Sequence, residues 1–183
     1  KVRGVTQPPN FMHYAVFSFL ANALSQVSSR GDILILDHFS ANREQIGYYS
    51  LALLFILAAT EITVTVQSIT TPYFSERAGD EKWFRKQLRK NQLRMILLSL
   101  VVAAGVLVLA YFIVPIFYGP GYAATVSFLA ILMIKYVLWS SYAVVAAALV
   151  GLGRMKYNFY VAAITVPIGL VLTFLGLQNF GIM

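Results

Sequence analysis

The sequence predicts an all-α, polytopic membrane protein that forms a bundle of five transmembrane helices. Of its 183 residues, 59% are hydrophobic and only 11% are charged, whereas an average soluble domain is about 45–50% apolar and about 25% charged. The mean hydropathy is +0.73, and the apolar residues gather in five stretches long enough to cross a bilayer as helices of ~20 residues. This composition excludes a disordered chain and argues against an ordinary soluble domain.

The five predicted spans are separated by polar residues, turns and prolines. They cover residues 11–39, 46–73, 95–118, 122–150 and 157–177. Pro8 and Pro9 precede the first span, and the turn at 119–121 separates the third from the fourth. In the third span we expect Ser99 and Gly105 to be packing positions, because small residues allow membrane helices to approach closely.

Basic residues lie almost entirely on one side of the predicted membrane. Eleven of the fourteen Lys and Arg residues precede the first span or lie in the second and fourth connections, and only Arg43 lies on the opposite side. The positive-inside rule then predicts a cytoplasmic N-terminus for this chain. The net charge of +7 is therefore interpreted as a topology signal, which disfavours nucleic acid as a partner and leaves membrane lipids as expected partners.

The basic segment before the third span also carries apolar residues at near-helical spacing, namely Trp83, Phe84 and Leu88. One interpretation is an interfacial helix that lies on anionic lipid. The other is a basic cytoplasmic loop that continues into the third span. The sequence leaves both open.

Four ionisable residues lie within the predicted spans: Arg30, Asp32, Glu61 and Lys135. An isolated charge at the centre of a membrane helix costs ~2.5–3.5 kcal/mol on insertion scales, so such residues need a polar cavity or each other. We predict that Arg30 and Lys135 bind substrate and that Asp32 and Glu61 bind a coupling ion, H⁺ or Na⁺. A salt bridge between Lys135 and either Asp32 or Glu61 is the structural alternative.

Polar and aromatic side chains share helix faces with these charges, given the helical periodicity. One stripe of the first span ends at Asp32, a second lies beside Glu61, and two aromatic residues lie on the face of Lys135. Rings beside a cation suit a sugar-phosphate ligand, although they are also ordinary packing residues. The predicted cavity lining is Ser18, Asn22, Ser25, Ser29, Thr65 and Ser68, and the predicted substrate-binding aromatics are Trp139 and Tyr142.

The sequence contains no familiar catalytic or metal-binding motif. It has no Cys, and His13 and His38 are not spaced as ligands on one helix face. There is no phosphate loop, nucleophile elbow or HExxH motif. We therefore expect no catalytic residue, no metal site and no cofactor, and a transporter rather than an enzyme.

A series of short motifs resembles the start of the C-terminal half of polysaccharide biosynthesis proteins, in the same order and spacing. The motifs are 32–39 (DILILDHF), 46–52 (IGYYSLA), 71–75 (TPYFS), 118–124 (YGPGYAA), Gly153-Arg154 and 179–183 (NFGIM). Members of this family are lipid-linked oligosaccharide flippases of the multidrug/oligosaccharidyl-lipid/polysaccharide exporter superfamily. The resemblance implies that residues 1–183 are a fragment of the C-terminal transmembrane lobe, whose partner is the missing N-terminal lobe of the same protein.

The resemblance also implies a function and a location. The protein is expected to move lipid-diphosphate-linked polysaccharide repeat units across the cytoplasmic (inner) membrane of a prokaryote by alternating access, with Asp32 matching the acidic residue of the lobe's first helix. The alternatives are a cation-coupled multidrug exporter, a lipid II flippase and, less favoured, a membrane-embedded sugar-transfer enzyme. Without the other lobe, we expect the fragment not to fold stably alone, because its polar stripes would face lipid.

Overall fold

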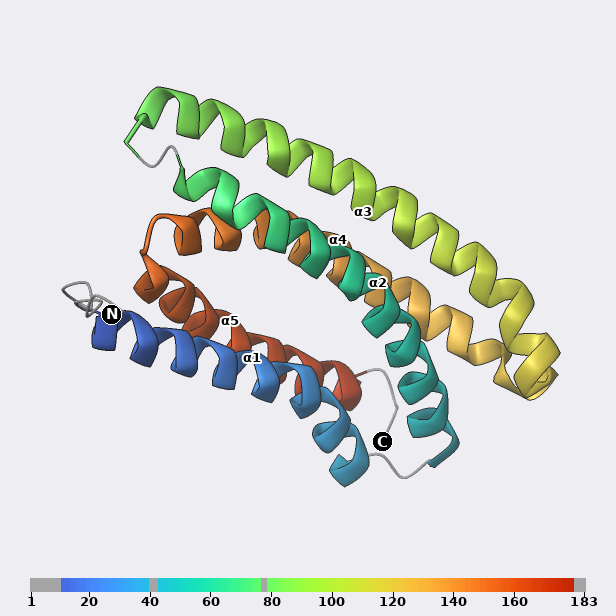
Figure 1. The fold of residues 1–183 in the computed structure, drawn as a ribbon. Coiled ribbons are helices and arrows are strands. Elements are labelled where there is room, and N and C mark those ends of the chain that lie inside the picture. The colour runs from blue at the N-terminus through green and yellow to red at the C-terminus, as the bar shows by residue number, and fades with distance from the viewer. Residues whose placement is uncertain (1–10, 40–42, 77–78, 180–183) are drawn as a thin grey trace, which may run out of the picture.

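The computed structural model describes residues 11–39, 43–76 and 79–179, and every regular element within these ranges is helical. The elements are α1 (Phe11–Phe39), α2 (Arg43–Ser75), α3 (Glu81–Tyr118), the short 3-10 helix η1 (Pro120–Ala123), α4 (Ala124–Gly151) and α5 (Met155–Asn179). Successive helices run in opposite directions, so the start of α1, the α2–α3 connection and the α4–α5 connection lie at one end (Figure 1). We call this the basic end, because the basic segment of α3 also begins there. The predicted all-α membrane helix bundle is confirmed.

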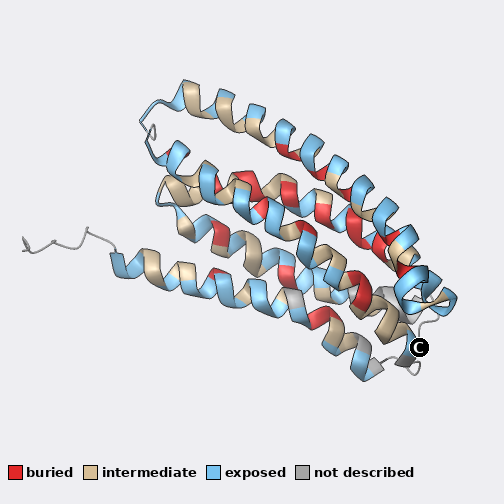
Figure 2. Ribbon diagram, turned by 45° about the vertical axis from the view of Figure 1, so that its right-hand side comes forward, coloured by how far each residue is buried: buried red, intermediate tan, exposed pale blue. Residues whose placement is uncertain are grey.

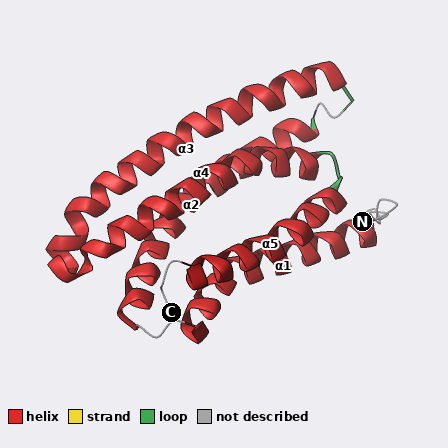
Figure 3. Ribbon diagram, turned by 180° about the vertical axis from the view of Figure 1, so that it is seen from behind, coloured by secondary structure: helices red, strands yellow, loops and turns green. Residues whose placement is uncertain are grey.

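The five long helices fall into two groups. In one group α4 packs between α2 and α3, and in the other α1 packs along α5, with few contacts between the groups (Figures 1 and 3). The buried side chains lie mainly along α4 and on the sides of α2 and α3 that face it (Figure 2). This core includes Leu51, Ala59, Leu129 and Tyr136.

Helix α3 begins well before the predicted span. It starts at Glu81 rather than near residue 95, and the Asp80 side chain caps it by accepting a hydrogen bond of 3.0 Å from the Trp83 backbone N–H. An Asp at this position satisfies one of the free N–H groups of a first helical turn. The 38 residues of α3 correspond to a length of about 57 Å, which exceeds the ~30 Å hydrocarbon core of a bilayer.

The apolar side of the basic segment packs against protein. Trp83, Phe84 and Leu88 lie against the cluster formed by Phe74, Met95 and neighbouring α4 residues. The ring centroids of Phe74 and Phe84 are 5.0 Å apart. This packing favours a segment that continues into the third span over an interfacial helix that inserts its apolar side into lipid.

Two glycines allow close approaches between helices. A Cβ atom at Gly151 would lie 2.8 Å from the backbone oxygen of Thr71, and one at Gly31 would lie 2.6 Å from the Leu170 side chain. Of the two predicted packing positions in α3, Ser99 is buried. The prediction for Gly105 is wrong, because the residue is exposed and a Cβ atom added there would meet no described atom of another element within 4 Å.

Within the described residues, three helical stretches are long and apolar enough to cross a membrane: Glu44–Ser75, Glu81–Tyr118 and Pro120–Gly151. The apolar stretch of α5, Met155–Val171, is shorter. Helix α1 is not among the three, and it carries the charged residues Arg30, Asp32 and Asp37. Membrane crossing by α1 and α5 therefore remains a prediction.

Candidate functional site

An ion pair joins the two helix groups. Lys135 Nζ on α4 donates to Asp32 Oδ2 on α1 at 2.7 Å, and the Tyr49 hydroxyl on α2 donates to the same oxygen at 3.4 Å. Asp32 is 6% exposed, whereas the Lys135 side chain is 61% exposed. The acid is thus enclosed by protein while its cation is largely accessible.

Each member of this site is held by its own helix packing. Asp32 follows Gly31, whose missing side chain lets α1 approach Leu170 of α5. The Tyr49 ring meets Phe128 of α4 edge-on, with centroids 6.3 Å apart. Lys135 lies near the middle of α4 and is its only charged residue. Three different helices therefore converge on one carboxylate.

A buried hydrogen-bond network next to Lys135 fixes the register of α2 on α4. Thr63 Oγ1 lies 3.2 Å from the Tyr136 hydroxyl and 3.1 Å from Ser140 Oγ. The Tyr136 hydroxyl also donates to the Ala59 backbone oxygen at 3.1 Å. Because these buried polar groups satisfy each other, the network specifies one alignment of the two helices and so holds the backbone at Lys135 in place.

Lys135 has hydrogen-bond donors left for a second ligand beside Asp32. A lysine ammonium has three N–H donors, and one of them is used by Asp32. An oxyanion that approaches the exposed side of Lys135 can therefore be bound by the remaining donors. Removing the cation would leave the buried Asp32 carboxylate without its counter-charge, which is costly.

The two aromatic residues predicted to bind substrate differ in their surroundings. Trp139 lies one turn from Lys135 on the same face of α4 and is exposed. Tyr142 is used in a contact between helices, because its hydroxyl donates to Asn158 Oδ1 on α5 at 2.9 Å. Asn158 Nδ2 in turn donates to the Ala146 backbone oxygen at 3.3 Å. Tyr142 therefore makes a second connection between the two helix groups, from α4 to α5.

The other predicted charges do not join the ion pair. Glu61 is exposed and lies about 200° around α2 from Thr63, on the face turned away from α4. Arg30 is exposed on α1 and has no ion-pair partner among the residues that the structure describes. Of the two salt bridges considered for Lys135, the structure shows the one with Asp32 and not the one with Glu61.

The predicted cavity-lining residues are placed on two helices. On α2, Thr65 and Ser68 are exposed beside Glu61, and their hydroxyls donate to backbone oxygens one turn earlier at 2.8 Å. On α1, Ser18 is half-buried, whereas Asn22 and Ser25 are exposed. The side chain of Ser29 lies outside the described residues.

Tyr49 and Tyr136 are the two site residues that the sequence did not single out for a role. Tyr136 directly follows Lys135, and Ser140 lies one turn further on the same face of α4. This polar stripe beside the charged residue is the sequence feature that could have identified Tyr136. Within the described part of the chain, no group of three His, Asp or Glu residues is arranged to hold a metal ion.

Comparison with known proteins identifies a family for the chain. Residues 5–127 match the family described as polysaccharide biosynthesis protein, which is roughly two thirds of the sequence. This range contains Asp32 and Tyr49 and ends before Lys135. No curated protein and no solved structure matches the chain. The chain belongs to the polysaccharide biosynthesis protein family.

Proposed function

We propose that the protein is a flippase that moves lipid-diphosphate-linked oligosaccharide, the repeat unit of a polysaccharide, across the cytoplasmic membrane by alternating access. Membership of the polysaccharide biosynthesis family supports a role in the synthesis or transport of such a polymer. In this proposal the chain belongs to the C-terminal lobe of a two-lobed carrier with its N-terminus in the cytoplasm. The carrier makes and breaks no covalent bond.

The observation that carries the proposal is the ion pair between buried Asp32 and exposed Lys135. The pair joins α1 to α4, which belong to the two separately packed helix groups. A diphosphate supplies oxyanions that compete with Asp32 for the Lys135 ammonium. Substrate binding therefore weakens the tie between the two groups, and this couples the ligand to their relative movement.

The same exchange provides a way to couple transport to an ion. When Lys135 turns to the diphosphate, the buried Asp32 loses its counter-charge, which is costly. The coupling ion, H⁺ or Na⁺, then binds to Asp32 and takes the place of Lys135. Release of that ion and return of Lys135 to Asp32 reset the carrier. Trp139, exposed on the face of Lys135, is suited to stack against a sugar ring.

The test is transport of a labelled lipid-diphosphate oligosaccharide by the full-length protein in proteoliposomes. Lys135→Gln is expected to lower the initial rate by about tenfold or more, the effect of losing a charge-assisted hydrogen bond. Lys156→Gln is the matched control, because it removes the same charge from an exposed position near the basic end. The control is expected to transport at the normal rate.

A double variant separates substrate contact from simple pairing. If Lys135 and Asp32 served only to neutralise each other, the variant Asp32→Asn/Lys135→Gln would regain transport, since no unpaired charge remains. The proposal expects it to stay as slow as Lys135→Gln alone. Normal transport by either variant, at normal protein levels, would overturn the assigned role of Lys135.

Glu61 supports a second candidate, a cation-coupled exporter of organic cations. This acid is exposed near the middle of α2 and has no ion-pair partner among the described residues. The same proteoliposomes distinguish the two functions. Export of an organic cation that is lost in Glu61→Gln but kept in Lys135→Gln would favour the exporter.

A further inference from the structure

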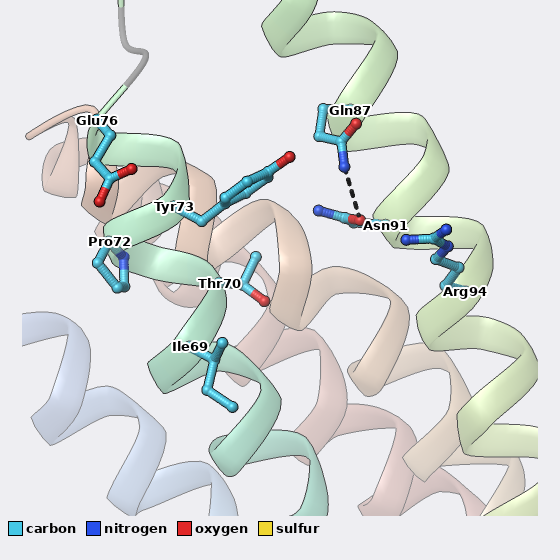
Figure 4. Close-up of a pocket in the computed structure, with 8 residues that line it drawn as sticks. All are labelled: Ile69, Thr70, Pro72, Tyr73, Glu76, Gln87, Asn91 and Arg94. Carbon is cyan, nitrogen blue, oxygen red and sulfur yellow. Dashed lines mark hydrogen bonds between the residues drawn. The ribbon is translucent and has the colours of Figure 1, made fainter.

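A polar cleft opens between the end of α2 and the first half of α3, away from the ion pair (Figure 4). Its volume is about 430 Å³. Tyr73 extends from α2 toward α3, where Gln87 Nε2 donates to Asn91 Oδ1 at 3.4 Å. Arg94 lies on the α3 wall beyond Asn91, and Glu76 lies on the α2 wall (Figure 4). The cleft thus offers a cation, a carboxylate, two amides and an aromatic ring.

The cleft lies where both helices change from charged to apolar. After Arg94, α3 has no Asp, Glu, Lys or Arg up to Tyr118, a length of about 36 Å, enough to cross the hydrocarbon core. On α2 the residues 62–75 are uncharged and Glu76 follows them. Ile69, at the apolar end of the cleft, is 68% exposed. The cleft therefore spans the expected boundary between head groups and acyl chains.

Basic residues outnumber acidic ones on the half of α3 that forms one wall of the cleft. Lys82, Lys86, Arg89 and Lys90 are exposed on this half, and Lys90 lies one turn before Arg94. Glu81 is paired with Arg85, whereas Arg94 makes no ion pair with any residue that the structure describes. The positive-inside rule accounts for basic residues at this end, but it does not require an exposed arginine in a concave polar site beside the membrane.

We propose that this cleft binds the head group of an anionic glycerophospholipid from the surrounding leaflet. The guanidinium of Arg94 binds the phosphate, for which its planar fork of N–H groups is suited. The amides of Gln87 and Asn91 bond the head-group hydroxyls. The acyl chains then lie along the exposed apolar side chains of Ile69 and Leu97.

A lipid in this cleft is distinct from a transported substrate. Lys135 lies near the middle of α4, whereas Arg94 lies at the last polar turn of α3 before its apolar part. The lipid would bridge α2 and α3 at the basic end, where Phe74, Trp83 and Phe84 supply the direct contact. Bound lipid therefore stabilises the position of the basic segment relative to the bundle.

The experiment is native mass spectrometry of the detergent-purified protein titrated with phosphatidylglycerol. Arg94→Gln is expected to weaken binding by about tenfold or more, because it removes a charged hydrogen-bond partner of the phosphate. Arg85→Gln is the matched control, since it removes the same charge from the same half of α3 and is expected to bind within about twofold of the unmodified protein. Equal losses in the two variants would overturn the site.

Two further arms identify the ligand. Phosphatidylethanolamine is expected to bind less tightly than phosphatidylglycerol, and equal binding would overturn the preference for an anionic lipid. Glycerol 3-phosphate and inorganic phosphate are expected not to displace the lipid at millimolar concentration, and displacement would assign the cleft to a soluble anion.

If Arg94→Gln cannot be purified, the unmodified protein is crosslinked to phosphatidylglycerol that carries a photoreactive head group. Crosslinks in residues 69–76 and 87–94 support the proposal, and crosslinks confined to other segments overturn it.

Discussion

The tight contact at Gly151 provides a quantitative test of how α4 packs on α2. A Cβ atom added there would lie 2.8 Å from Thr71 O, 3.1 Å from Ser75 N and 3.2 Å from Phe74 Cβ. Two of these atoms belong to the α2 backbone, so the clash cannot be relieved by rotating a side chain. Adding a methyl group to a well-packed contact costs about 1–3 kcal/mol, and the helix-propensity gain of at most ~1 kcal/mol over glycine offsets only part of it.

We therefore expect Gly151→Ala to lower the free energy of unfolding by up to about 2 kcal/mol. In a domain of 150–250 residues, each kcal/mol shifts the midpoint by roughly 2–4 °C, so the melting temperature falls by up to roughly 8 °C. The assay is thermal unfolding of the full-length protein, purified in detergent and followed by circular dichroism. The matched control is Gly105→Ala, where the added methyl group meets no described atom within 4 Å and stability is expected to be unchanged or raised.

Gly31 provides an intermediate case for the same prediction. Gly31→Ala meets a single flexible group, the Leu170 side chain, at 2.6 Å, so its cost is expected to lie between those of the other two variants. Unfolding of Gly151→Ala at or above the unmodified temperature would refute the reasoning. An equal fall for Gly105→Ala would refute it as well, because glycine position would then not matter.

Four other variants test the packing and the ion pair, three of them in the same unfolding assay and Trp83→Ala by hydrogen exchange. Tyr136→Phe removes a buried hydroxyl that bonds two groups and is expected to cost about 1–3 kcal/mol; no loss would mean that the network does not hold α2 on α4. Trp83→Ala removes the ring that packs on Phe74 and is expected to speed hydrogen exchange in residues 81–94, whereas unchanged exchange would contradict the packing of this segment. Lys135→Gln is expected to destabilise more than Asp32→Asn, because it leaves a buried charge while the second variant leaves an exposed one; the reverse order would contradict the assigned burial.

Much of the fold follows directly from the sequence, because apolar runs of this length have few alternatives. The bounds of α1 agree with the predicted span, and α2, α4 and α5 differ from their predicted spans by a few residues at each end. The exception is the start of α3. The apolar stretch begins only at residue 95. The helix nevertheless begins earlier, in a charged segment, because the Asp80 side chain caps its first turn and Trp83 packs on Phe74.

The candidate site could be predicted only in part. The four charges within the predicted spans were visible because each is unusual in an apolar run. The partner of Lys135 could not be read from the sequence, because Asp32 lies 103 positions away and pairing depends on how the two helix groups meet. Tyr49 was not assigned a role for the same reason, because the sequence does not show whether its hydroxyl faces an acid on another helix.

The two interpretations of Lys135, a substrate contact and an internal salt bridge, are physically compatible. A carrier that alternates between empty and loaded states needs a counter-charge for its binding cation when no substrate is present, because an unpaired charge in the membrane is costly. Asp32 supplies that counter-charge from a buried position, and Lys135 keeps most of its side chain accessible. A fully buried pair would stabilise one packing of the helices but could not respond to a ligand. A fully exposed pair would contribute little to either state. In the proposed carrier, the asymmetric burial of this pair would let one lysine serve the empty state through Asp32 and the loaded state through a diphosphate.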